Sequence, residues 1–185
     1  MQDIQQILDV LRGGGAMLYP TDTLWGIGCD ATNEKAVAKV FEIKKRAPSK
    51  SLIVLVDGED MLDRYVRKVP EIARTVVALS TTPLTVIYPE GVGFARGVCA
   101  PNGAIAIRVV DHDFCRQIIR KLGRPIVSTS ANLAGEKAPE NFSEISEEVK
   151  SSVDVTVSEK FEGAPTRQAS SIIQLSVDGQ VRVIR

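Results

Sequence analysis

Short apolar runs, each about the length of one buried strand, interleave along this chain with segments whose apolar residues recur at helical spacing. The runs predict strands at 16–19, 52–56, 84–88, 104–109, 126–128, 153–157, 170–175 and 181–184. Helical spacing, caps and stops predict helices at 3–12, 58–66, 70–79, 113–122 and 143–150, and one more that Asn33 caps. Because the two kinds of element do not alternate one to one, the sequence favours an α+β domain, with a twisted mixed sheet flanked by helices in three layers (α/β/α).

Chain length and charge narrow the possibilities further. A chain of 185 residues suits one domain covering 1–185. The 23 Lys and Arg residues balance the 23 Asp and Glu residues, so any site for an anion has to be local. No apolar run approaches the ~20 residues that cross a bilayer, and the N-terminus has no signal pattern, so we expect a cytoplasmic protein that does not engage membranes.

The residues that usually mark metal, disulfide or hydrolase chemistry are sparse. Cys29, Cys99 and Cys115 are widely spaced and odd in number, which suits reduced thiols better than disulfides or a zinc site. His112 is the single histidine, and no nucleophile-elbow motif accompanies it. The glycines at 26–28 formally match part of a dinucleotide fingerprint, but the preceding strand ends near Pro20, several residues too early. A nicotinamide-binding enzyme therefore stays a remote alternative.

Polar and cationic residues gather where apolar elements end, which is where open sheets flanked by helices usually bind ligands. The first cluster, 19–28, exits a strand and carries two threonines and an aspartate, although a hydrogen-bonded turn would explain it equally well. The second cluster, 44–51, carries four cations after a helix. Cations are common at helix ends, but several that converge can also bind a polyphosphate.

Two later strands carry the remaining clusters. Alternation in 104–109 puts Arg108 on the same face as Ala104 and Ala106. A charged side chain on a face of alanines resembles the wall of a cavity. The alternative is that Arg108 forms a structural ion pair. The hydroxyl and amide groups of 128–132 suit phosphate oxygens and Mg²⁺, but they also form ordinary turns and caps.

Taken together and in this order, these segments resemble the YrdC-like L-threonylcarbamoyladenylate synthases, in the form without an additional C-terminal domain. The matching motifs are Tyr19-Pro20-Thr21-Asp22-Thr23 with Gly26-x-Gly28, Lys44-x-Arg46 with Lys50, Ala106-Ile107-Arg108, and Ser128-Thr129-Ser130-Ala131-Asn132. The resemblance implies a YrdC-like fold with a basic ligand cavity. It also implies that L-threonine, bicarbonate and ATP give threonylcarbamoyl-AMP and pyrophosphate, for threonylcarbamoyladenosine modification of tRNA.

The resemblance also implies roles for single residues. ATP would be bound by Lys44, Arg46, Lys50, Ser130, Asn132 and Arg185. Threonine and bicarbonate would be bound by Thr23, Arg108, Ser128 and Ser170. The residues with an implied catalytic part are Lys44, Arg46, Ser130 and Asn132. Ala138 stands where the family often has a serine that helps to bind the nucleotide.

The resemblance also implies that Mg²⁺ enters with the ATP and that the protein itself forms no metal site. It implies a downstream partner, a tRNA-modifying transferase complex. Weak tRNA binding is a further expectation. The alternative from another class is a non-catalytic RNA-binding module that uses the same basic cavity. Neutral net charge and few aromatic residues disfavour it, because such modules usually combine a basic face with stacking side chains.

Overall fold

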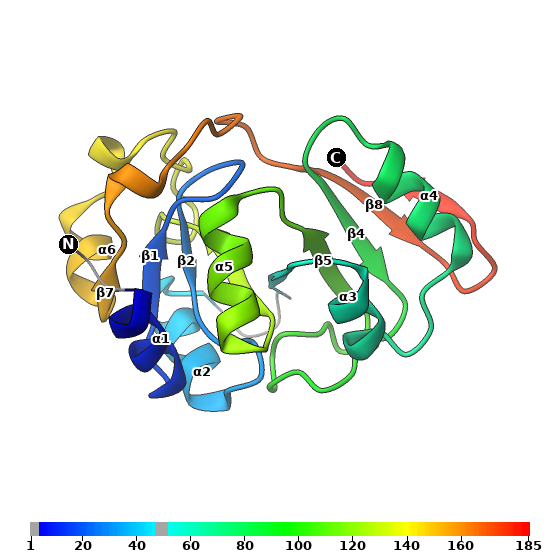
Figure 1. Ribbon diagram of the computed structural model, residues 1–185, viewed down its shortest axis with the longest axis horizontal. Helices are drawn as coiled ribbons and strands as arrows, with labels where there is room; N and C mark the ends of the chain where they lie inside the picture. The colour runs from blue at the N-terminus through cyan, green and yellow to red at the C-terminus, as the bar shows by residue number, and fades with distance from the viewer. Residues whose placement is uncertain (1–3, 47–51) are drawn as a thin grey trace.

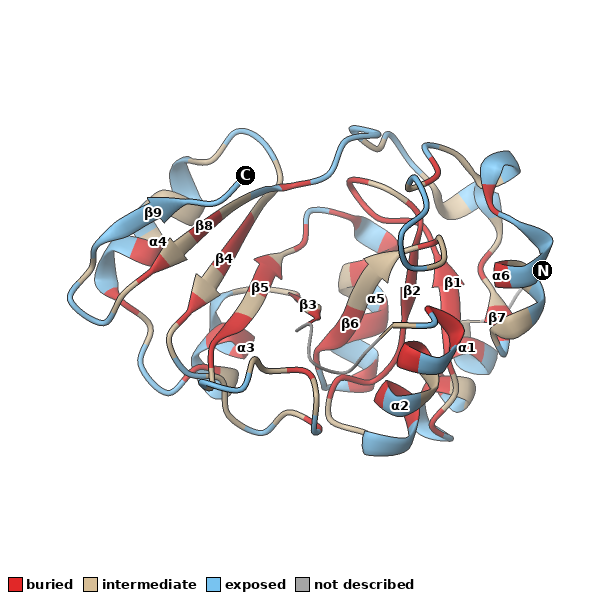
Figure 2. Ribbon diagram, turned by 180° about the vertical axis from the view of Figure 1, so that it is seen from behind, coloured by how far each residue is buried: buried red, intermediate tan, exposed pale blue. Residues whose placement is uncertain are grey.

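A computed structural model of the chain describes residues 4–46 and 52–185. In this part of the chain, nine strands form one sheet in the order β7-β1-β2-β6-β3-β5-β4-β8-β9 (Figures 1 and 2). The strands are β1 (Met17–Tyr19), β2 (Gly26–Gly28), β3 (Ile53–Val56), β4 (Leu84–Tyr88), β5 (Ile105–Val109), β6 (Ile126–Ser130), β7 (Val155–Thr156), β8 (Ser171–Leu175) and β9 (Val181–Val183). Parallel pairs (β1 with β7, β3 with β5, β4 with β8) occur among antiparallel ones, so the predicted mixed sheet is confirmed.

Helices flank this sheet, as predicted. They are α1 (Ile4–Arg12), α2 (Glu34–Ile43), α3 (Glu59–Tyr65), α4 (Glu71–Leu79), α5 (Asp113–Leu122) and α6 (Glu147–Ser152), with short 3₁₀ turns at Phe142–Glu144 and Glu159–Phe161. In Figure 1, α3, α4 and α5 lie in front of the sheet. Figure 2 shows β4, β5, β6 and β8 from the opposite side of the sheet.

Local sequence explains where the helices begin and end. The side chain of Asn33 accepts a hydrogen bond from the backbone N–H of Ala36 at 3.1 Å and caps α2, as predicted. Helix α5 ends at Gly123, whose φ of 73° lies in the left-handed region that glycine adopts easily. Cys115, Ile118 and Ile119 on α5 are fully buried, which anchors this helix in the core.

Strand β2 is the main difference from the sequence prediction, which placed no strand at these glycines. Gly26–Gly28 pairs with β1 on one side and β6 on the other. A Cβ at Gly28 would lie 2.5 Å from the ring of Tyr19 and 2.5 Å from the carbonyl oxygen of Val127. Glycine is therefore needed here because two chain segments approach it closely. Since glycine has a low strand propensity, the sequence did not indicate a strand at these positions.

Smaller boundary differences occur in other elements. Strand β6 continues to Ser130, beyond the predicted end at 128. The predicted helix at 143–150 is divided into a 3₁₀ turn and α6, because Ser146 caps a new helix by accepting a hydrogen bond from Val149 N at 3.3 Å. Neither shift moves a predicted site residue.

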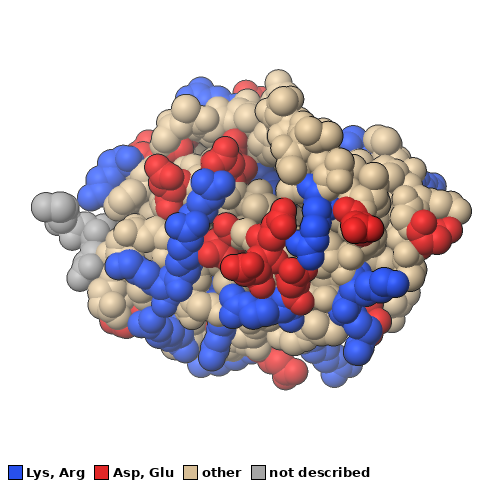
Figure 3. Space-filling view, turned by 45° about the vertical axis from the view of Figure 1, so that its right-hand side comes forward, with Lys and Arg blue, Asp and Glu red and all other residues tan. Residues whose placement is uncertain are grey.

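The surface is mixed in charge, in line with the neutral composition. On the face shown in Figure 3, Lys and Arg side chains are interspersed with Asp and Glu side chains. Within 4–46 and 52–185, no helix is long and apolar enough to cross a membrane.

Candidate active site

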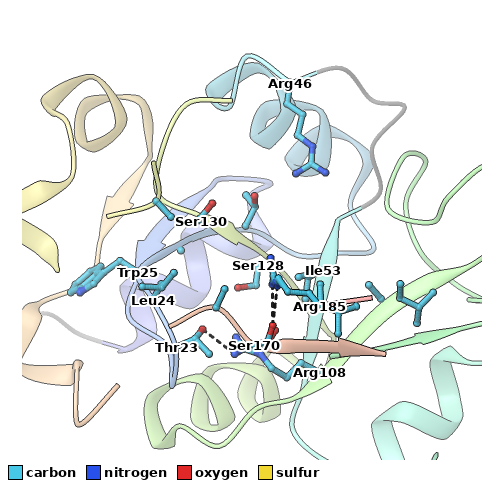
Figure 4. Close-up of a pocket in the computed structure, with 17 residues that line it drawn as sticks. Thr23, Leu24, Trp25, Arg46, Ile53, Arg108, Ser128, Ser130, Ser170 and Arg185 are labelled. Atoms are coloured by element: carbon cyan, nitrogen blue, oxygen red, sulfur yellow. Dashed lines mark hydrogen bonds between the residues drawn. The ribbon is translucent and has the colours of Figure 1, made fainter. Parts of the chain in front are cut away.

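A cavity of about 410 Å³ lies against the sheet and gathers polar residues from distant parts of the chain. The predicted site residues that line it are Thr23, Arg46, Arg108, Ser128, Ser130, Ser170 and Arg185 (Figure 4). Lys44 and Asn132 do not line it, and Lys50 lies outside the described residues. Ala138, which stands where the family often has a serine, is also part of the lining.

Strand register explains how the floor of this cavity forms. Ser128 on β6 lies opposite Ile53 on β3, which lies opposite Ala106 on β5, which lies opposite Ile87 on β4. All four residues line the cavity. Because side chains at one register level point to the same face of a sheet, this row forms a floor across four strands. The small side chain of Ala106 leaves room there, as the alternation in 104–109 predicted.

Arg108 and Thr23 meet at one end of the cavity. Nη1 of Arg108 donates to Thr23 Oγ1 at 2.9 Å and lies 3.0 Å from Asp22 Oδ1. The arginine side chain is 4% exposed and the aspartate side chain 9%. Arg108 therefore fulfils both interpretations that the sequence left open, because it lines the cavity and also belongs to a buried ion pair.

Lys44 lies behind the cavity wall. Its Nζ donates to Ser130 O at 2.6 Å, to Asn132 O at 2.5 Å and to Asn132 Oδ1 at 3.1 Å. Burial, with the nearby charge of Arg46, lowers the pKa of Lys44 to about 8. The three protons of its ammonium group are directed at three protein oxygens, so Lys44 shapes the wall that carries Ser130.

Asn132 secures the same wall from the loop that follows β6. Its Nδ2 donates to Leu133 O at 3.0 Å and to Glu136 O at 2.8 Å, while its Oδ1 accepts from Lys44. The backbone N–H of Ala134 returns a hydrogen bond to Lys44 O at 2.9 Å. These contacts tie the end of α2 to the end of β6.

Arg46 follows α2 and comes from the side of the cavity opposite to Thr23 and Ser170 (Figure 4). Burial lowers the pKa of its guanidinium from the ordinary value. Its backbone N–H donates to Phe41 O at 3.1 Å, which ties Arg46 to the end of α2.

Ser170 and Arg185 complete the lining near β8. The hydroxyl oxygens of Ser170 and Thr85 lie 2.7 Å apart, and Nε and Nη2 of Arg185 donate to Ser170 O at 3.3 and 3.0 Å. Thr85 is fully buried, and sequence reasoning assigned it no role. Its signal was a threonine within the apolar strand 84–88, two residues before Ile87 and therefore on the same face of the sheet.

Trp25 is a lining residue that the sequence analysis also missed. Its ring packs on Phe142 at 4.8 Å between centroids, and its Nε1 donates to Glu162 Oε1 at 3.0 Å. The side chain is buried and hydrogen-bonded, so it forms a wall and offers no open stacking face.

The charges of the cavity define what it can bind. Among the described residues that line it, the cations are Arg46, Arg108 and Arg185, and none is Asp or Glu. Converging guanidinium groups and hydroxyls suit phosphate and carboxylate oxygens. In the described chain, no group of three or more His, Cys, Asp or Glu residues is placed to hold a metal ion.

The fold and this cavity define a mixed α/β domain with an arginine-lined cavity on its sheet. The model of the Sua5/YciO/YrdC family, described as "Telomere recombination", matches residues 9–185. The chain belongs to this family.

Relatives with assigned names agree with this membership. The chain is 34% identical to threonylcarbamoyl-AMP synthase of Vibrio parahaemolyticus over 138 residues, which cover 73% of this chain and 75% of the relative. It is 36% identical to the protein of the same name from Stutzerimonas stutzeri, also over 138 residues, covering 73% of each chain.

Solved structures show the same fold. A structure of P. abyssi Sua5 superposes with a TM-score of 0.83 at 26% identity and covers 94% of this chain. This chain spans only 53% of that Sua5 chain. E. coli YciO superposes with a TM-score of 0.80 at 22% identity, covering 98% of this chain and 87% of YciO, which supports the fold alone.

Proposed function

We propose that this chain is an L-threonylcarbamoyladenylate synthase, which forms threonylcarbamoyl-AMP and pyrophosphate from L-threonine, bicarbonate and ATP. The observation that carries the proposal is the division of the cavity. Arg46 lies on one side, and Thr23, Ser170 and Arg108 lie on the other (Figure 4). Such a division suits two anionic reactants that must meet between the two groups.

The reaction needs positioning more than it needs a protein nucleophile. Threonine and bicarbonate first give a carbamate with loss of water. A carbamate oxygen then attacks the α-phosphorus of ATP, the bond to the bridging oxygen of the β-phosphate breaks, and pyrophosphate leaves with the electron pair. Arg46 would offset charge on the phosphates, while Arg108 and Thr23 would hold the amino acid.

Mg²⁺ is best understood here as part of the ATP substrate. Proteins usually hold Mg²⁺ through one or two carboxylates together with substrate phosphates. Since the described lining residues include hydroxyls but no carboxylate, the cavity does not fit a resident metal site. Asn132 belongs to the polar cluster 128–132 that suited Mg²⁺ in the sequence, but its amide is committed to Lys44, Leu133 and Glu136.

The relatives support the choice of substrates. The proteins from Vibrio parahaemolyticus and Stutzerimonas stutzeri are named threonylcarbamoyl-AMP synthase, and one P. abyssi Sua5 structure contains L-threonine. The product would pass to a tRNA-modifying transferase complex. Cytoplasmic action and weak tRNA binding stay predictions from the sequence.

The structure favours an enzyme over the RNA-binding alternative. The aromatic side chain in the described lining belongs to Trp25, and it is 1% exposed with its N–H bonded to Glu162. Single-strand binding usually relies on exposed aromatic faces along a basic groove. The face in Figure 3 carries interspersed charges of both signs.

A labelling experiment tests the proposal. The protein is incubated with ATP, Mg²⁺, threonine and carbon-labelled bicarbonate, and the nucleotide products are analysed by mass spectrometry. We expect an adenylate that carries the bicarbonate carbon. An unlabelled adenylate of threonine itself, or no adenylate, would contradict the proposed reaction.

A further inference from the structure

Asp22, to which the resemblance gave no role, lies where three segments meet. It belongs to the turn between β1 and β2, and its side chain is 9% exposed. Its Oδ1 lies 3.0 Å from Arg108 Nη1, and its Oδ2 accepts a hydrogen bond from the backbone N–H of Asp111 at 3.3 Å. Its main-chain oxygen accepts from Thr166 N at 2.9 Å. Asp22 therefore joins the turn to the end of β5 and to the segment before β8.

Asp22 reaches Arg108 from behind the candidate active site. A second cavity of about 380 Å³ is lined by Asp22, Asp111, Arg116 and Thr166, among others. Arg108 lines the active-site cavity and not this rear cavity, whereas Asp22 lines the rear cavity and not the active-site cavity. A substrate in the active-site cavity would touch Arg108 and not Asp22.

The carboxylate restricts how the guanidinium can lie. Nη1 of Arg108 donates a hydrogen bond to Thr23 Oγ1 at 2.9 Å and forms an ion pair with Asp22 Oδ1 at 3.0 Å, although this carboxylate oxygen accepts no hydrogen bond among the described residues. Nε of Arg108 is buried and has no hydrogen-bond acceptor among the described residues. The hydrogen bond to Thr23 and the charge of Asp22 together fix the position of Nη1, and with it the orientation of the guanidinium toward the cavity.

The carboxylate also sets the charge at this end of the cavity. A buried arginine without a counter-charge is strongly destabilised, and the nearby anionic group offsets its charge. The Asp22–Arg108 pair is neutral as a whole. Arg46 on the opposite side, and Arg185 beside Ser170, add positive charge to a cavity whose described lining contains no Asp or Glu. Arg108 with its counter-charge suits the carboxylate of an amino acid, and Arg46 suits a polyphosphate.

We propose that Asp22 is a positioning residue for the amino-acid end of the cavity, where it orients Arg108 and neutralises it so that this end prefers an amino acid over phosphate. The inference rests on the proposed function, because it concerns the threonine end of that same site. It predicts that loss of the carboxylate charge weakens threonine binding and lets phosphate compete there.

The test compares three full-length variants with the wild-type protein. Asp22→Asn keeps the side-chain size and removes the charge. Asp22→Glu keeps the charge and moves it by one methylene group. The matched control is Asp111→Asn, since the Asp111 side chain is 86% exposed and pairs with Arg116, while its backbone N–H to Asp22 is retained.

Binding of threonine and of ATP is measured separately by calorimetry, with and without inorganic phosphate. For Asp22→Asn we expect threonine Kd to rise about tenfold or more and ATP Kd to stay within about twofold. Phosphate should compete with threonine in this variant but not in the wild type or in Asp111→Asn. Asp22→Glu should lose threonine affinity without gaining the phosphate competition.

Unchanged threonine affinity in Asp22→Asn, or equal losses for threonine and ATP, would overturn the inference. If Asp22→Asn does not fold, the threonine affinity of Asp22→Glu decides, and an unchanged value overturns it. Adenylate formation is measured on the same wild-type sample. A wild-type protein that binds threonine but forms no adenylate would contradict the proposed function alone.

Discussion

Nζ of Lys44 lies 2.6 Å from the main-chain oxygen of Ser130, and this contact joins the end of α2 to the end of the strand that lines the cavity. Two further acceptors, both on Asn132, lie within 3.1 Å of the same nitrogen. An ammonium group has three N–H donors, which match these three oxygens, whereas a neutral amine has two. The wall that carries Ser130 therefore depends on the protonation of Lys44.

ATP affinity should fall as the pH rises through the pKa of Lys44. Burial lowers this pKa to about 8, so the ammonium form prevails below that pH and is lost above it. Calorimetry of ATP binding without threonine, from about pH 7 to about pH 9.5, isolates this group from titration of the threonine amine. In Lys44→Arg, whose guanidinium stays charged, the alkaline decrease should vanish. A wild-type affinity that is constant over this range would contradict the assigned role.

The same pKa predicts the opposite trend for stability. The folded pKa of Lys44, about 8, is below its ordinary value of 10.5, so the unfolded chain binds more protons between these values. The contribution of Lys44 to the free energy of unfolding therefore rises with pH in this window, which means that the folded protein gains stability. Urea unfolding of wild type and Lys44→Met, compared across the window, would reveal the contribution as a pH-dependent difference.

Arg46→Ala should weaken ATP binding by about 1–3 kcal/mol, the range for a charge-assisted contact. The matched control is Lys45→Ala. The Lys45 side chain is 64% exposed, it pairs with Glu148 at 2.6 Å, and it does not line the active-site cavity. Calorimetry should show a loss for Arg46→Ala and almost none for Lys45→Ala. Equal ATP affinities for the two variants would remove Arg46 from the nucleotide site.

Thr23→Val should raise the KM for threonine at least several-fold and leave the KM for ATP nearly unchanged. The substitution keeps the shape of the side chain and removes the hydroxyl that accepts from Arg108 at 2.9 Å. Thr32→Val is the control, because the Thr32 hydroxyl bonds to Asp30 and does not line the cavity. If Thr23→Val acts only on the ATP titration, Thr23 belongs to the nucleotide end.

Gly28→Ala should destabilise the fold by about 1–3 kcal/mol, the usual cost of overpacking. Its Cβ would lie 2.5 Å from both the Tyr19 ring and the Val127 carbonyl oxygen. Gly58→Ala, where a Cβ meets nothing within 4 Å, should change stability by about 0.5 kcal/mol or less. Urea unfolding of both variants provides the comparison, and similar unfolding midpoints would contradict the close packing around β2.

Much of the architecture could be predicted from the sequence because burial leaves a periodic pattern. The apolar spacing of α5 and the alternation of β5 predicted both elements close to their observed bounds. Strand β2 could not be predicted in this way. Its glycines are required by close contacts with Tyr19 and with the Val127 carbonyl oxygen. These contacts form only in the folded chain, so no local sequence pattern indicates them.

In the candidate site, too, some residues could be predicted from the sequence and others could not. Local motifs selected Thr23, Arg46 and Ser130, which line the cavity, because polar residues at the ends of apolar strands and helices are visible in one sequence. The hydrogen bond from Lys44 to the end of β6 joins positions that are 86 residues apart, and no local pattern encodes such a contact. Asp22 was visible as a carboxylate between two threonines, but its role depends on Arg108, which only the fold brings to it.

Pyrophosphate release by the purified protein tests the central claim most directly. With Mg²⁺, ATP, threonine and bicarbonate all present, we expect pyrophosphate and an adenylate in equal amounts, since the β–γ unit of ATP leaves intact. Omission of threonine or of bicarbonate should each abolish both products, because the attacking carbamate oxygen exists only after the two combine. Pyrophosphate released at the same rate without threonine would contradict the account and indicate a nucleotide pyrophosphohydrolase.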